Sequence, residues 1–242
     1  MIQSLQDNRA VLLGAVAIFA FGLTASGYVL GDGLRRSKAA ERSVTVRGVS
    51  ERDVTADLAT WSVDFSNQGS DLGPVQSSVD RQARAVRGFF ARSGFAANAI
   101  TDTNVSVTRE QARDDLPERL TVRRTIQLRT NDVMKARAAF ARQSELLRDG
   151  VELSGSTITY TFTGLNNLKT GMIAEANKNA RSSAEQFARD SGASVGRIKT
   201  ASQGYFSVGA RDGEQCEGCD SSGGTSPFQK VRVVTTIDYD LG

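Results

Sequence analysis

The feature that most constrains the fold of this chain is an uncharged segment near its N-terminus. Residues 10–31, AVLLGAVAIFAFGLTASGYVLG, lie between Arg9 and Asp32 and carry no formal charge. As an α-helix rising about 1.5 Å per residue, the segment would be about 33 Å long, which is enough to cross a bilayer core. The sequence therefore predicts a short tail over residues 1–9, a transmembrane anchor over residues 10–31 and a basic linker over residues 32–42.

The alternatives to an anchor are a cleaved signal peptide and a buried helix of a soluble domain. Such a peptide usually has a shorter apolar region and a small-x-small cleavage site, and Leu23 is a poor match for that site. Within the segment, Gly22 and Ser26 are four residues apart, as are Gly27 and Gly31. Small residues at this spacing let membrane helices approach closely, although glycine is common in membrane helices in general. These four residues are therefore candidates for helix packing in the membrane.

The absence of histidine from all 242 residues excludes several kinds of chemistry. Ser-His-Asp and Cys-His catalysis, His-ligated zinc and His-ligated haem all need that side chain. The net charge of +3 is too small to indicate a nucleic-acid partner. We therefore expect a protein that is not an enzyme, has no cofactor and no metal site, and does not bind nucleic acid.

Hydrophobic periodicity predicts an α+β domain over residues 43–242. Strands are expected at residues 43–49, 59–65, 104–108, 120–129, 158–162, 195–206 and 231–239, and helices at 72–90, 133–147 and 167–191. The middle of this order, residues 59–163, is the β-α-β-β-α-β order of ferredoxin-like folds. We expect a mixed, largely antiparallel sheet with this middle, a long Ala-rich helix and two C-terminal strands, preceded by one transmembrane helix. The first strand and the last two would extend that sheet or build a second small one.

The long helix is expected to present one apolar stripe to the sheet and a charged face to solvent. Lys169, Glu175, Lys178 and Glu185 are assigned to the solvated face. The stripe is expected to contain Ile173, Ala176, Ala180, Ala184, Phe187 and Ala188.

Residues 207–228, SVGARDGEQCEGCDSSGGTSPF, lack periodicity and predict a long flexible loop. The loop contains both cysteines, Cys216 and Cys219. The acidic neighbours Glu214, Glu217 and Asp220 disfavour a redox-active thiolate, and a closed zinc site would need two further ligands from a second copy. The preferred interpretation is a local disulfide or two incidental thiols, and the redox and metal interpretations remain open.

Arg123, Arg124 and Arg129 suggest a basic stripe along one strand. RNA-binding sheets of this fold stack bases on exposed aromatic side chains, and the segment LTVRRTIQLR has none. A solvated sheet face with nearby acids as partners is therefore favoured.

Three segments together resemble the SIMPL-domain family. These are VTVRGVSERDVTADLATWSVDF, with its V-x-V-x-G strand; MIAEANKNARSSAEQFARDSGASVGRI, an Ala-rich helix that ends in glycine; and the closing strand KVRVVTTIDYDLG. The resemblance spans about residues 43–241, and the C-x-x-C pair departs from the usual pattern.

The resemblance implies a bacterial, exported or membrane-anchored protein without an established catalytic site, which tends to form homo-oligomers and has loose links to stress. It places the C-terminal domain in the periplasm, with a single pass through the inner membrane. Arg35, Arg36 and Lys38 instead give a mild bias towards a cytoplasmic C-terminus. Few charges carry that bias, so the periplasmic orientation is preferred.

The leading hypothesis is a homo-oligomeric envelope assembly or scaffold, anchored to the membrane by its N-terminal helix. The alternatives are a redox- or metal-responsive sensor that uses the C-x-x-C loop, and a module that binds an envelope ligand or an envelope protein partner.

Overall fold

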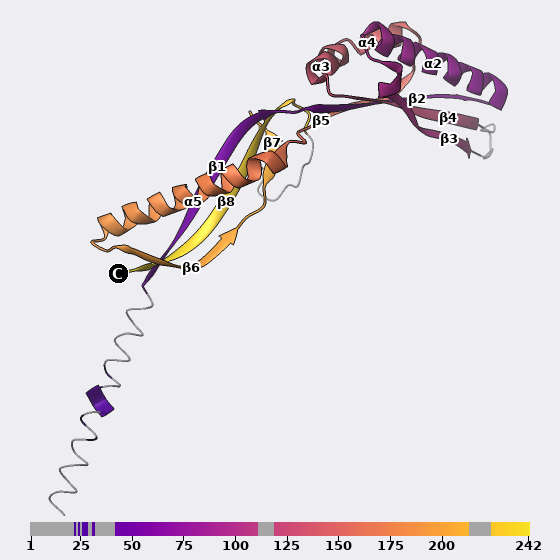
Figure 1. Ribbon diagram of the computed structural model, residues 1–242. Coiled ribbons are helices and arrows are strands. Elements are labelled where there is room, and N and C mark those ends of the chain that lie inside the picture. The colour runs from indigo at the N-terminus through magenta and orange to yellow at the C-terminus, as the bar shows by residue number, and fades with distance from the viewer. Residues whose placement is uncertain are drawn as a thin grey trace, which may run out of the picture. The chain divides into compact units, whose positions relative to one another are not determined.

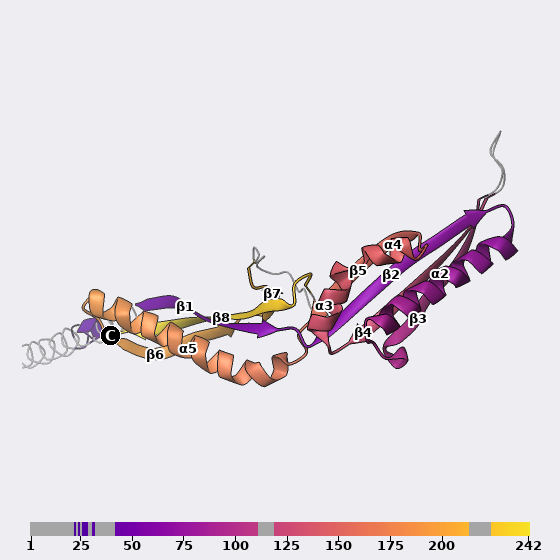
Figure 2. The same cartoon turned by 90° about the horizontal axis from the view of Figure 1, so that it is seen from above.

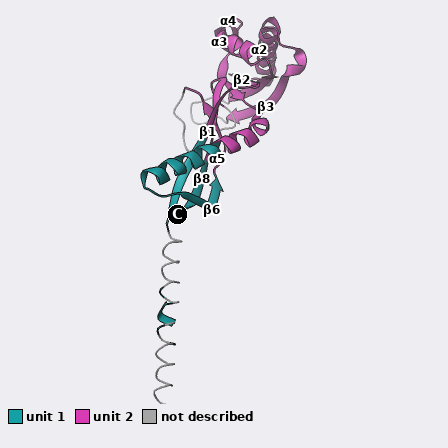
Figure 3. Cartoon of the chain, turned by 60° about the vertical axis from the view of Figure 1, so that its left-hand side comes forward, with its two compact units in different colours: residues 1–49, 176–203, 235–242 teal, residues 50–175, 204–234 magenta. Residues whose placement is uncertain are grey.

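The computed structural model describes residues 22, 24, 26–28, 31, 42–110, 119–212 and 224–242. The chain divides into two compact units, shown in Figure 3. Unit 1 contains residues 1–49, 176–203 and 235–242, and unit 2 contains residues 50–175 and 204–234.

Figure 1 shows the elements in chain order. They are β1 (Ser43–Thr55), β2 (Leu58–Gly69), α2 (Leu72–Arg92), a 3₁₀ turn (Ala97–Ala99), β3 (Ile100–Glu110), β4 (Arg119–Thr130), α3 (Val133–Ala141), α4 (Ser144–Arg148), β5 (Leu153–Thr161), α5 (Leu165–Asp190), β6 (Val195–Gln203), β7 (Ser207–Ala210) and β8 (Phe228–Leu241).

Unit 2 contains a four-stranded sheet in the order β3-β4-β2-β5, and every pair in it is antiparallel. Helices α2, α3 and α4 lie on one side of this sheet (Figures 1 and 2). The predicted β-α-β-β-α-β order is present, with its second helix divided into α3 and α4. Because the helix is broken between α3 and α4, the spacing of about 3.6 residues per turn in α3 does not continue into α4. Leu146 is the buried leucine of α4, whereas Leu147 is 59% exposed.

The core of unit 2 is built around Trp61 on β2. Its ring meets those of Phe89, Phe90 and Phe140 edge-on, with centroids 5.9, 5.0 and 5.2 Å apart. The indole Nε1 donates a hydrogen bond to Ser156 Oγ at 2.9 Å. Edge-to-face packing and a satisfied N–H together fix the orientation of the ring, because a buried donor without a partner is costly.

A second sheet has the order β1-β8-β6, with β7 also paired to β8. The N–H of Leu241 donates to the carbonyl of Arg42, and Thr45 Oγ1 donates to Asp238 at 3.3 Å, so β1 and β8 run antiparallel. The outer strands therefore form a second sheet of their own and do not extend the first, which is one of the two arrangements expected from the sequence. Within the segment expected as a loop, residues 207–210 pair with β8 as β7.

Helix α5 buries a stripe of residues that are four positions apart. This spacing produces a straight ridge, which lets the small side chains lie close to β1. A Cβ added at Gly48 would lie 2.7 Å from the Cβ of Ala180 and closer still to the carbonyl oxygen of Ala176. The predicted stripe is wrong in two places, since Ile173 is only half-buried and Phe187 is 52% exposed. The observed stripe is Met172, Ala176, Ala180, Ala184 and Ala188.

In the part of the chain that the structure describes, no helix is long and apolar enough to cross a membrane. Most of the predicted anchor and almost all of the linker lie outside the described residues. Gly22, Ser26, Gly27 and Gly31 are described, and each is helical and exposed. The anchor and its packing residues stay predictions.

Candidate functional site

Strand β3 is an edge of the unit 2 sheet and is the candidate site. Among the described strands it pairs only with β4, from Ile100 opposite Leu128 to Glu110 opposite Arg119. Every residue of β3 after Ile100 is exposed. An edge strand presents a row of backbone N–H and C=O groups that a further strand can pair with.

The middle of β3, residues 104–108, has the sequence Asn-Val-Ser-Val-Thr and carries no charge. Val105 is 60% exposed and Val107 is 55% exposed. Natural edge strands are usually protected from unwanted pairing by lysine, proline or inward-pointing charges. None of these protections is present over residues 104–108, so this stretch is open to pairing.

A bulge at Thr103 determines which way the valines face. Asp102 lies opposite Ile126 and Asn104 lies opposite Thr125, so Thr103 is an extra residue on β3. After a bulge of this kind the alternation of side chains between the two faces is shifted by one residue. Val105 therefore lies opposite Arg124, on the side of the sheet where the helices pack.

The two valines are exposed although they lie on the helix side of the sheet. Helix α2 packs on β2 and β4, the two central strands. It buries the apolar side chains of β4 but leaves Val105 and Val107 uncovered on β3. An apolar pair on an unprotected edge results, and a second strand would cover it.

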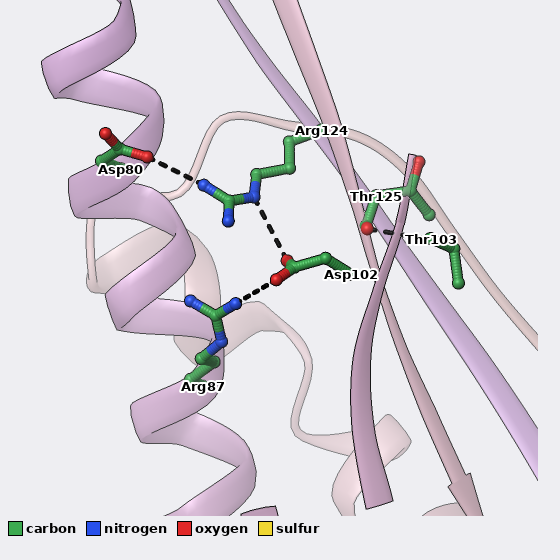
Figure 4. A network of polar contacts seen from close by, with 6 residues as sticks. All are labelled: Asp80, Arg87, Asp102, Thr103, Arg124 and Thr125. Carbon is green, nitrogen blue, oxygen red and sulfur yellow. Dashed lines mark hydrogen bonds and ion pairs between the residues drawn. The ribbon is translucent and has the colours of Figure 1, made fainter. Parts of the chain in front are cut away.

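A network of two arginines and two aspartates holds β3 in place beside α2 (Figure 4). Arg124 donates from Nη1 to Asp80 at 2.8 Å and from Nε to Asp102 at 3.2 Å. Arg87 on α2 donates to the other oxygen of Asp102. The Arg124 side chain is only 18% exposed, so its ion pairs are less screened by solvent than those of a surface arginine. The network joins α2, β3 and β4, and it ties the edge strand to the helix beside it.

The predicted arginine stripe is therefore divided between two faces. Arg124 lies on the helix side and is paired with acids, which confirms part of the favoured interpretation. Arg123 and Arg129 belong to the opposite, open face and are both exposed. The sequence pattern placed Arg123 and Arg129 correctly, but it gave no sign that Asp80 and Asp102 would meet Arg124.

Glu175 on α5 was expected to lie on a solvated face, but it has two partners. Its carboxylate accepts hydrogen bonds from Ser50 Oγ at 2.9 Å and from Arg52 Nη2 at 3.4 Å. These hydrogen bonds, that of Ser50 foremost, lower the pKa of Glu175 below its ordinary value. Ser50 is buried, and Glu175 provides its hydroxyl with a hydrogen-bond acceptor. Sequence reasoning missed this contact, because a serine and a glutamate 125 residues apart carry no local signal.

Cys216 and Cys219 lie outside the described residues, so neither their pairing nor the redox and metal hypotheses are tested. In the described ranges, no group of three or more Asp, Glu, Cys or His side chains is arranged to hold a metal ion.

Comparison with known proteins gives one extensive match. A family model described as "SIMPL: Protein of unknown function (DUF541)" matches residues 44–239. A search of curated proteins finds no match.

Among solved structures, similarity is found to the crystal structures of AtUAH in complex with (S)-hydroxyglycine and with glyoxylate. Their TM-scores are 0.27 and 0.26, at 15% and 16% sequence identity. Each match covers 54% of this chain, and the chain spans 34% of the other protein. Similarity this low does not establish a shared fold or function.

Proposed function

Since this chain belongs to the SIMPL (DUF541) family, we propose that it is a non-enzymatic, membrane-anchored periplasmic protein that assembles with copies of itself through the free edge of β3. The assembly would serve as a scaffold in the bacterial envelope, with its single pass in the inner membrane. We propose in addition that this scaffold takes part in a response to stress.

The unprotected edge over residues 104–108 is the observation that carries the proposal. Two copies of β3 can pair antiparallel about a two-fold axis at Ser106. Val105 of each copy would then lie opposite Val107 of the other, on one face of the joined sheet. Closed two-fold pairing of this kind is the commonest form of homo-oligomer, and cross-strand β-branched pairs stabilise it.

The arginine–aspartate network supports the proposal because it reduces the cost of pairing. A strand that is already ordered loses little conformational entropy when a partner binds. Asp102 is fixed by Arg87 and Arg124, next to the bulge that orients Val105. The edge would therefore meet its partner without rearrangement.

The uncharged segment 10–31 supports the anchored part of the proposal. Anchoring confines the chains to two dimensions and raises their effective concentration, which strengthens a weak edge contact.

The mass of the full-length chain in mild detergent tests assembly. The Val105→Lys/Val107→Lys double variant places two charges on the edge, and we expect it to weaken association at least tenfold. Met134→Lys/Leu147→Lys is the matched control, because these side chains are 50% and 59% exposed on α3 and α4 and it introduces the same charge. A wild-type chain that is monomeric at micromolar concentration contradicts the proposal, as does an edge variant that associates as strongly as the control.

A further inference from the structure

An open cavity of about 460 Å³ lies in unit 2, at the end of the sheet where β2 and β3 begin and β4 and β5 end. Its size falls within the range of about 300–1,000 Å³ that is usual for small-molecule sites. Five polar residues line it, and Leu58 and Ala99 complete it. The polar residues are Asn98, Thr101, Arg129, Asn131 and Thr163.

We propose that this cavity binds a small polar molecule through one carboxylate, held by the guanidinium of Arg129. The proposal concerns a ligand site whose lining does not include residues 104–108 of β3, and it does not depend on assembly.

Arg129 is available for such a ligand. No carboxylate in the described part of the chain forms an ion pair with it, whereas Arg124 on the same strand pairs with two. The cavity lining contains one cation and no acid. A guanidinium presents a planar fork of N–H donors that matches the two oxygens of a carboxylate.

The remaining lining groups fit the neutral part of a polar ligand. Asn98 and Asn131 carry side-chain amides, which both donate and accept hydrogen bonds. Thr101 adds a hydroxyl with the same double capacity, whereas the hydroxyl of Thr163 already donates to Asp57 and can only accept a hydrogen bond from a ligand. One positive charge surrounded by such neutral groups balances a singly charged carboxylate better than a doubly charged phosphate.

Asp57 builds the site by tying three strand ends together. Its two carboxylate oxygens accept hydrogen bonds from the N–H and the hydroxyl of Thr163, both at 2.8 Å. Its carbonyl oxygen accepts a hydrogen bond from Asn131 Nδ2 at 2.8 Å, and its N–H donates to Thr161. Two lining residues are therefore fixed before a ligand arrives, and both oxygens of the Asp57 carboxylate already have donors.

Saturation-transfer NMR on the full-length chain in detergent tests the site, with N-acetylglycine as the probe. N-acetylglycinamide is the matched ligand, because it differs only in lacking the charged carboxylate. Arg129→Gln is the test variant and Arg123→Gln is its control, since Arg123 is an exposed arginine of the same strand and face that does not line the cavity.

We expect N-acetylglycine to bind the wild-type chain and the Arg123→Gln variant alike, and to bind Arg129→Gln at least tenfold more weakly. N-acetylglycinamide should give no saturable signal, and inorganic phosphate should not displace N-acetylglycine at equal concentration. The proposal is overturned if no N-acetylglycine binds, if the amide binds equally well, if both variants lose binding equally, or if phosphate binds in place of the carboxylate. An unchanged melting temperature of Arg129→Gln establishes that a loss of binding is local.

Discussion

Gly48 on β1 approaches Ala180 on α5 so closely that a Cβ at position 48 would lie 2.7 Å from the Cβ of Ala180. The carbonyl oxygen of Ala176 is closer still, and it belongs to the helix backbone, which cannot move aside easily. The absence of a side chain at Gly48 is therefore what allows α5 to pack on β1.

Gly48→Ala should destabilise the chain by about 1–3 kcal/mol, because overpacking forces backbone shifts. Chemical denaturation of the full-length chain in mild detergent measures the effect. Gly171→Ala is the control, since Gly171 lies on α5, the helix that Gly48 packs against, and has no atom near its added Cβ. The control should be neutral or stabilising by up to about 1 kcal/mol, as alanine favours helix. Equal effects of the two substitutions would show that the close approach is absent.

Ser156→Ala should remove the only hydrogen-bond acceptor observed for the Trp61 indole in the described part of the chain. A buried donor without a partner costs about 1–3 kcal/mol, so the melting temperature should fall. Trp61 is the single tryptophan of the chain, so its fluorescence emission reports the change directly. Thr159→Ala, at an exposed position of the same strand, should leave both readouts unchanged. An unaltered emission spectrum in Ser156→Ala would falsify the assigned contact.

Glu175 should make the stability of the chain depend on pH. Hydrogen bonds from Ser50 and Arg52 lower its pKa in the folded state, so its charged form stabilises the fold. This contribution is fully present above the ordinary pKa of 4.5 and is lost as the pH falls through the lower, folded value. The difference in stability between the wild-type chain and Glu175→Gln should therefore be largest near neutral pH and shrink below about pH 4.5.

Denaturation midpoints measured at pH 7 and at pH 3.5 check this sign. Ser50→Ala removes the hydrogen bond that lowers the pKa of Glu175 most and should make the difference smaller at pH 7. A difference between the wild-type chain and Glu175→Gln that stays constant or grows on acidification would contradict the assignment.

Local patterns predicted much of the fold. The alternation from Ala59 to Phe65 correctly places Trp61 in the core, and the glycine at which the Ala-rich helix ends, Gly192, has a positive φ angle of 68°, which favours glycine there. These features depend on the period of a single element, which a sequence displays directly.

The rest depends on how elements cover one another. The sequence shows that Val105 and Val107 alternate in a strand, but the position of α2 over β2 and β4 decides that they stay exposed. Phe187 likewise has the spacing of an inner residue, yet the ridge that packs on β1 is made of alanines. The Arg124 network and the cavity at Arg129 join distant segments, so no local pattern indicates them.

The central claim is that β3 pairs with β3 of a second copy about an axis at Ser106, and disulfide cross-linking tests it most directly. Residues directly opposite in an antiparallel pair have Cα atoms about 4.5–5.5 Å apart, within reach of a disulfide. Ser106→Cys, in a full-length chain with Cys216→Ser and Cys219→Ser, should form a covalent dimer on mild oxidation that reduction reverses. Thr159→Cys in the same background is the exposed control and should stay monomeric. A Ser106→Cys chain that gives no more dimer than this control would contradict the account.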